Sequence, residues 1–128
     1  MVYSAIGSNV NLAQQIEELN KRYGTSIIIS ETIYQQVYHD FLCRLLDVIP
    51  VVDYPDGLRI YELIASSDST LAIEKESFVI KYEHSLQYVI DGDYQKAKTI
   101  VTALQEDHPE DKSVIYLLDK ILKETKKG

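Results

Sequence analysis

A short run of small polar residues divides this chain into two parts that call for different folds. Residues 65–70 read Ala-Ser-Ser-Asp-Ser-Thr, a composition typical of a connection. Before this run, short β-branched segments alternate with segments of helical period, and after it every apolar pattern is helical. The sequence therefore predicts an α+β fold in which residues 1–64 form one domain, residues 65–69 a linker and residues 70–128 a helical domain.

The first part is expected to contain a strand, a helix, a strand, a helix and a β-hairpin. The expected elements are a strand over 2–7, a helix over 9–23, a strand over 25–30, a helix from Ser30 to about Val37 or Tyr38, and hairpin strands over 41–52 and 58–64. Pro55-Asp56-Gly57 is expected to form the hairpin turn, because proline presets φ and glycine permits a positive φ.

The second part is expected to be entirely helical. Three helices are predicted over residues 72–90, 94–107 and 110–125. The breaks between them fall at Asp91-Gly92-Asp93 and at His108-Pro109, where glycine and proline interrupt the helical pattern.

Charge, apolar runs and cysteine content together narrow the classes of function that are expected. The chain has 128 residues and a formal net charge of −7, and no basic face dominates, so a nucleic-acid-binding protein is not expected. No apolar run reaches the roughly 18 residues that a membrane helix needs, and the first residues lack the pattern of a signal peptide. Cys43 is the single cysteine. A cytoplasmic protein without membrane contact is therefore expected, although a parent protein could be anchored upstream.

The sequence shows no set of residues at the spacing that a metal site needs. His39, His84 and His108 are distant from one another and from Cys43, so a zinc site is not expected.

Several short motifs in residues 2–64 occur in the order found in one enzyme family. They are Gly7 with Val10-Asn11-Leu12-Ala13, then Leu19-Asn20-Lys21-Arg22-Tyr23-Gly24, Ile27-Ile28-Ile29-Ser30-Glu31, the spaced Phe41, Arg44 and Leu46, and Tyr61-Glu62-Leu63. Together they resemble the C-terminal part of the catalytic domain of class III adenylate and guanylate cyclases. The resemblance implies that this part is half of a ferredoxin-like cyclase fold.

The resemblance also implies a site. In the family, an asparagine and an arginine on the first helix position the ribose and stabilise the transition state, and here Asn11 and Gln15 occupy those positions. Ser4 falls where the family often contacts the purine. Two Mg or Mn ions are implied for a complete domain, held by aspartates on strands expected to lie before residue 1. No metal or other cofactor is expected in this chain itself.

The departures from the family pattern fall at its charged positions. Gln15 replaces the arginine, Ser8 stands where many members have an aspartate, and Val51-Val52-Asp53-Tyr54 replaces a V-K-G-K segment on the hairpin. An amide cannot supply the positive charge that an arginine brings to a developing oxyanion. We therefore expect a degenerate catalytic site and no cyclase activity from this chain alone. For Asn11, a ligand contact and a buried amide that ties the strand to the helix are equally compatible with the sequence.

The helical part resembles a tetratricopeptide (TPR) unit. Tyr88, Gly92, Tyr94, Ala97 and Pro109 follow the spacing of that repeat. The third helix is expected to act as a cap. The resemblance implies a protein partner for these helices.

Two functions remain open at this point. The chain could be a fragment of a class III cyclase that binds ATP or GTP only in a complete parent. It could instead be a non-catalytic module, with a pseudo-cyclase half for dimerisation and TPR-like helices for a protein partner. A homodimer is expected in either case, unless the helical tail folds back over the exposed sheet edge and apolar helix face.

Overall fold

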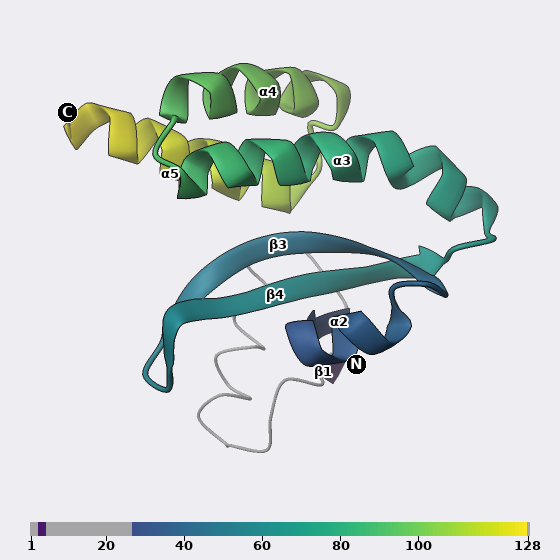
Figure 1. Ribbon diagram of the computed structural model, residues 1–128. Helices are drawn as coiled ribbons and strands as arrows, with labels where there is room; N and C mark the ends of the chain where they lie inside the picture. The colour runs from purple at the N-terminus through teal and green to yellow at the C-terminus, as the bar shows by residue number, and fades with distance from the viewer. Residues whose placement is uncertain (1–2, 5–26, 128) are drawn as a thin grey trace. The chain divides into compact units, whose positions relative to one another are not determined.

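The computed structural model describes residues 3–4 and 27–127 of the chain. It has the α+β fold that the sequence predicts, with strands followed by helices (Figure 1). The elements are β1 (Tyr3–Ser4), β2 (Ile27–Ser30), α2 (Glu31–Val37), β3 (Phe41–Val51), β4 (Tyr54–Ser66), α3 (Thr70–Ile90), α4 (Tyr94–Asp107) and α5 (Lys112–Lys127). The predicted helix over 9–23 lies outside the described residues.

The chain forms two compact units that divide between Glu76 and Ser77, inside α3. The first unit contains the sheet, α2 and the first turns of α3. The second unit contains the rest of α3 with α4 and α5. The assignment of the two parts to a cyclase-like and a TPR-like domain stays a prediction.

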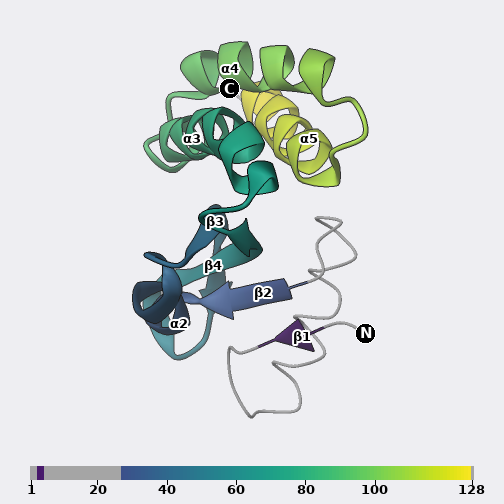
Figure 2. The same ribbon diagram turned by 90° about the vertical axis from the view of Figure 1, so that its right-hand side faces the viewer.

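The sheet of the first unit has the strand order β1-β2-β4-β3. The short strand β1 runs parallel to β2, with Ser4 opposite Ile28 (Figure 2). The β2–β4 and β4–β3 pairs are antiparallel. Ile28, Leu46 and Ile60, one from each of the three longer strands, are fully buried and form the centre of the core.

Helix α2 begins at the residue that the sequence predicts. The Ser30 hydroxyl accepts a hydrogen bond from the Ile33 amide at 3.3 Å, so Ser30 is the N-cap. None of the seven residues of α2 is buried. The helix is held to the sheet by Tyr34, whose ring stacks on that of Tyr61 with centroids 4.0 Å apart, and by an exposed ion pair between Glu31 and Arg59.

The hairpin turn lies three residues earlier than the sequence predicts. Val52 and Asp53 form the turn between β3 and β4, and the predicted turn Pro55-Asp56-Gly57 belongs to β4. The register passes from Ile49 opposite Leu58 to Val51 opposite Tyr54, so these three residues on β4 face the single Pro50 on β3. The prediction was wrong because a proline and a positive-φ glycine also suit a bulge, and Gly57 indeed has φ of +85°.

The connection between the sheet and α3 is fixed by hydrogen bonds. Ala65 and Ser66 still belong to β4, so the segment predicted as a linker over 65–69 starts inside a strand. The Ser67 amide donates to the Asp40 carbonyl at 2.9 Å. The Ser69 hydroxyl accepts from the Ala72 amide at 3.1 Å and donates to the Ser66 carbonyl at 2.6 Å. These bonds attach the first turn of α3 to the end of the hairpin.

The second unit is a set of packed helices whose boundaries follow the sequence prediction closely. Helix α4 spans the predicted residues, and Gly92 before it has φ of +83°, which only glycine adopts easily. Asp93 and Asp111 cap the starts of α4 and α5 by accepting from the amides of Lys96 and Val114. The core of this unit is formed by Phe78, Val79, Tyr82, Ser85, Leu86, Val89, Ala97, Val101, Leu104, Ser113, Val114, Leu117 and Ile121.

None of the helices in residues 27–127 is long and apolar enough to span a membrane.

Candidate functional site

The residues predicted to touch a nucleotide are placed only in part. Ser4 lies in β1, at the edge of the sheet beside β2, and its backbone pairs in register with Ile28. Asn11 and Gln15 lie outside the described residues. Their roles therefore rest on the sequence resemblance.

Two motif residues of the hairpin form a buried ion pair. Arg44 on β3 and Glu62 on β4 are direct register partners. Arg44 donates from Nη2 and Nε to the same carboxylate oxygen, Oε1 of Glu62, at 2.8 and 3.1 Å. The side chains are 4% and 18% exposed. The cost of removing such a pair from water offsets much of its electrostatic attraction, so its net contribution to stability is small.

The pair explains why arginine and glutamate occur together in the two hairpin motifs. Arg44 belongs to the spaced Phe41, Arg44 and Leu46, and Glu62 to Tyr61-Glu62-Leu63. Both residues carry the resemblance, but their contact cannot be predicted from the motifs, because it depends on the register of two strands. Since Arg44 is buried against Glu62, its cation is not presented to a solvent-exposed polyphosphate.

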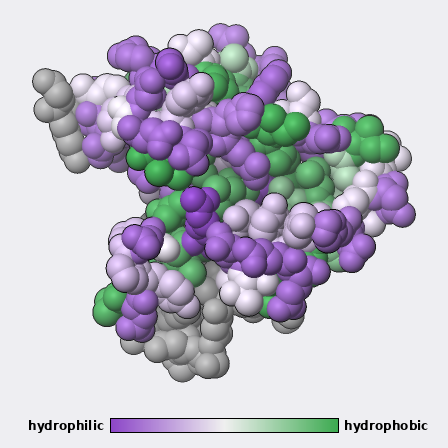
Figure 3. Space-filling model, viewed as in Figure 1, coloured by the Kyte–Doolittle hydropathy of each residue, from purple (hydrophilic) through white to green (hydrophobic). Residues whose placement is uncertain are grey.

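The tip of the hairpin presents apolar and acidic side chains. Val52 is 99% exposed and Tyr54 45% exposed, and apolar surface marks this tip at the lower left of Figure 3. The hollow beside the turn is lined by Val48, Pro50, Val51, Val52, Tyr54, Pro55, Asp56 and Gly57. The charged side chain in this set is the carboxylate of Asp56, and exposed Asp53 lies in the turn itself. The charged side chains of residues 48–57 at the tip are therefore acidic, where the resemblance implies lysines.

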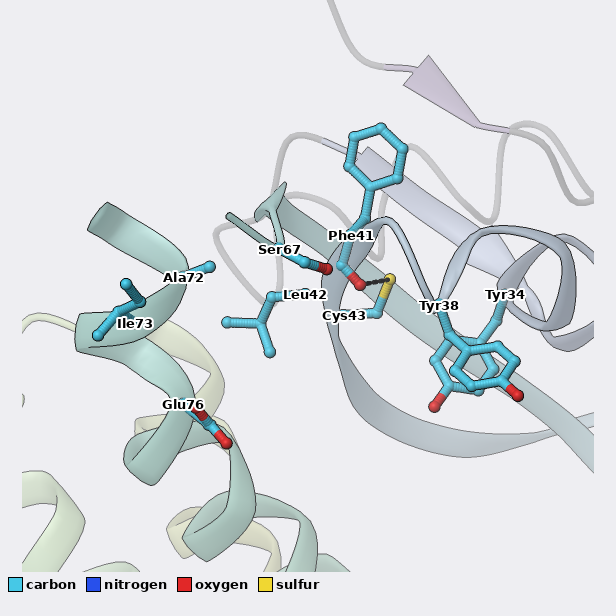
Figure 4. Close-up of a pocket in the computed structure, with 9 residues that line it drawn as sticks. All are labelled: Tyr34, Tyr38, Phe41, Leu42, Cys43, Ser67, Ala72, Ile73 and Glu76. Carbon is cyan, nitrogen blue, oxygen red and sulfur yellow. Dashed lines mark hydrogen bonds between the residues drawn. The ribbon is translucent and has the colours of Figure 1, made fainter. Parts of the chain in front are cut away.

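A cavity of about 300 Å³ lies elsewhere in the first unit, at the start of β3. It is lined by Tyr34, Tyr38, Phe41, Leu42, Cys43, Ser67, Ala72, Ile73 and Glu76 (Figure 4). No motif in the sequence predicts this cavity. Its walls come from α2, β3, the residues after β4 and α3, and no local motif marks such a meeting of separate segments.

No group of three or more histidine, cysteine, aspartate or glutamate side chains able to hold a metal is found in residues 3–4 and 27–127.

Comparison with known proteins gives two similar sequences. The chain is 24% identical, over 126 residues or 96% of its length, to "Adenylate cyclase, terminal-differentiation specific" of Dictyostelium discoideum. It is 38% identical over 61 residues, or 48% of its length, to "Putative serine/threonine-protein kinase/receptor R831" of Acanthamoeba polyphaga mimivirus. The chain spans 6% and 4% of these two proteins, so it corresponds to a small part of each.

No family model matches the chain, and no solved structure matches it. The similarity supports a cyclase-like relationship of the chain. The similarity to the adenylate cyclase covers residues from both compact units, because it includes nearly the whole chain.

Proposed function

We propose that this chain is the C-terminal part of a class III nucleotidyl cyclase-like domain, followed by a TPR-like helical appendage, within a larger signalling protein. The observation that carries the proposal is the similarity to an adenylate cyclase over 126 residues. The hairpin geometry supports it, since Arg44 and Glu62, two residues of the resemblance, meet in register in the core.

On this proposal, the chain alone makes no cyclic nucleotide. Class III chemistry needs two metal ions to activate the ribose 3′-hydroxyl and to hold the triphosphate. The resemblance places the family's metal-binding aspartates on strands outside the motifs that this chain matches. Cyclisation also needs positive charge on the transition state. Gln15 supplies none, and the described tip around Asp53 and Asp56 is negative. The parent is therefore a weak cyclase or a pseudoenzyme.

The activity of the parent protein with Mn²⁺ tests this proposal. We expect weak turnover from the wild type, an increase in Gln15→Arg and no increase in Gln14→Arg, a matched substitution one residue away. An unrelated active class III cyclase in the same assay sets the scale. A wild-type turnover comparable to that reference contradicts the degenerate site.

A second candidate function is a non-catalytic dimerisation and interaction module. The exposed apolar side chains at the hairpin tip, Val52 and Tyr54, favour it, because they suit a protein contact better than a polyphosphate. The parent would then form a homodimer through the cyclase-like half, and the TPR-like helices would bind a protein partner. A Gln15→Arg parent that remains inactive while it is dimeric favours this second function over the first.

A further inference from the structure

The cavity at the start of β3 has the chemistry of a binding site for a small organic cation. We propose that it binds a primary ammonium ion carried on an apolar body, a ligand class that the cyclase-like function does not require. The volume of about 300 Å³ is at the lower end of the range for small-molecule sites.

The walls of the cavity provide a place for an apolar body. Leu42 points towards Ala72 and the first turns of α3, whereas Cys43 points towards Tyr38 (Figure 4). The lining therefore includes side chains that leave the start of β3 in different directions. Ile73 is 70% exposed and Tyr38 45% exposed. A ligand packed against either of these side chains would remove apolar surface from water.

The charge of the lining selects a cation. Glu76 is the charged residue in the lining, and it makes no ion pair with any residue in the part of the chain that the structure describes. Three aromatic rings, those of Tyr34, Tyr38 and Phe41, also belong to the lining. They lie on the other side of the start of β3 from Glu76 (Figure 4), so they offer apolar surface to the body of the ligand while Glu76 offers the negative charge. The lining contains no lysine or arginine, so an anion would find no partner there.

The cavity is held by local hydrogen bonds. The Ser67 amide and hydroxyl donate to the carbonyls of Asp40 and His39, at 2.9 and 3.3 Å. The capping bonds of Ser69 fix the first turn of α3, which carries Ala72 and Ile73. A preformed wall lowers the entropic cost of binding a ligand.

The test is a titration of the ¹⁵N-labelled chain with 2-phenylethylammonium, followed by amide chemical shifts. Phenylpropionate, which has a similar body and the opposite charge, is titrated in parallel. We expect saturable shifts at Leu42, Cys43, Ser67 and Ala72 with the amine, and none of comparable size with the carboxylate.

Two exposed substitutions on α3 separate recognition from general attraction to an acidic protein. Glu76→Gln is expected to weaken amine binding by about two- to fivefold, as for a partly exposed ion pair. Glu74→Gln, a matched change that is outside the cavity lining, is expected to leave the affinity unchanged. The amide spectra of the two variants verify that the fold is intact.

Several results would overturn the proposal. Equal shifts with the amine and the carboxylate would show that charge is not recognised. Shifts spread over other exposed apolar residues, such as Val52 and Ile115, would show that the cavity is not a site. Equal weakening by Glu74→Gln and Glu76→Gln would reduce the effect to overall charge. A lysine-containing apolar peptide that moved the same amides at far lower concentration would identify a protein partner in place of a small cation.

Discussion

Arg44 and Glu62 are charged residues that face each other across two strands of the first unit. Their side chains form a buried ion pair across β3 and β4. Replacing one partner by an apolar side chain leaves the other charge poorly compensated. Replacing both partners by apolar side chains leaves an apolar contact in place of the ion pair.

The stability of three variants tests this role. Arg44→Met is expected to lower the free energy of unfolding of the first unit by about 3 kcal/mol. Adding Glu62→Leu to Arg44→Met is expected to recover part of that loss. Urea unfolding followed through the amide signals of β3 and β4 measures both. A double variant as unstable as the single one would show that the arginine acts through packing and not through its charge.

Two glycines have nearly the same backbone conformation and different surroundings. Gly57 and Gly92 have φ of +85° and +83°. A Cβ atom on Gly57 would lie 2.5 Å from Cγ1 of Val48, whereas one on Gly92 would meet nothing within 4 Å.

Alanine at the two positions should therefore have unequal effects. Both substitutions incur about 1 kcal/mol of backbone strain, and Gly57→Ala also forces Val48 to move, for a total of about 2–3 kcal/mol. Hydrogen exchange in the first unit measures the loss of stability in Gly57→Ala, and hydrogen exchange in the second unit measures the loss in Gly92→Ala. If Gly92→Ala is the more damaging change, the bulge opposite Pro50 is not packed as described.

At the scale of an element, the ring of Tyr34 is a principal contact between α2 and the sheet. Tyr34 stacks on Tyr61 with an interplanar angle of 3°, and no residue of α2 is buried. The exposed pair between Glu31 and Arg59, at 3.6 Å, adds little.

Tyr34→Ala is expected to release α2 without unfolding the sheet. Amide exchange should accelerate over residues 31–37 and remain slow in β3 and β4. Glu31→Gln, on the same helix, should change the exchange of α2 by less than a factor of about three, as an exposed ion pair does. Loss of protection in β3 together with α2 would show that the helix is an integral part of the core.

The elements differ in how well the sequence predicts them. Ser30, Gly92 and Pro109 are local signals whose effect does not depend on distant residues, and the helices that they delimit were predicted within two or three residues. The hairpin turn was predicted wrongly because Val52 and Asp53 carry no turn signal, while Pro55-Asp56-Gly57 carry a strong one and form a bulge. The choice between turn and bulge is made by the pairing of two long strands, which no short window contains.

The candidate sites, too, can be predicted from the sequence only where a local motif marks them. The substitution at Gln15 and the acidic tip can be recognised from the sequence, since each replaces a known residue type in a motif. The Arg44–Glu62 contact and the cavity beside Leu42 require strand register and the path of the chain after β4. These features were accessible only from the structure.

At the scale of the whole molecule, self-association is a prediction of the proposed function. β3 is the end strand of the described sheet, and the apolar tip beside it is exposed. We expect a dimer in light scattering at micromolar concentration, and a shift towards monomer in Val52→Asp, a substitution at a side chain that is 99% exposed and therefore does not affect the core. A wild type that is monomeric throughout the concentration range would contradict the dimer.

The central claim is that Gln15 and the acidic hairpin tip leave too little positive charge to hold a polyphosphate. The most direct measurement is the affinity of the parent protein for a non-hydrolysable ATP or GTP analogue with Mn²⁺, compared between the wild type and the Gln15→Arg, Asp53→Lys double variant. We predict weak binding by the wild type and at least about tenfold tighter binding by the double variant, since charged hydrogen bonds contribute on the order of 1–3 kcal/mol each. Tight binding by the wild type that the two added charges do not improve would contradict it.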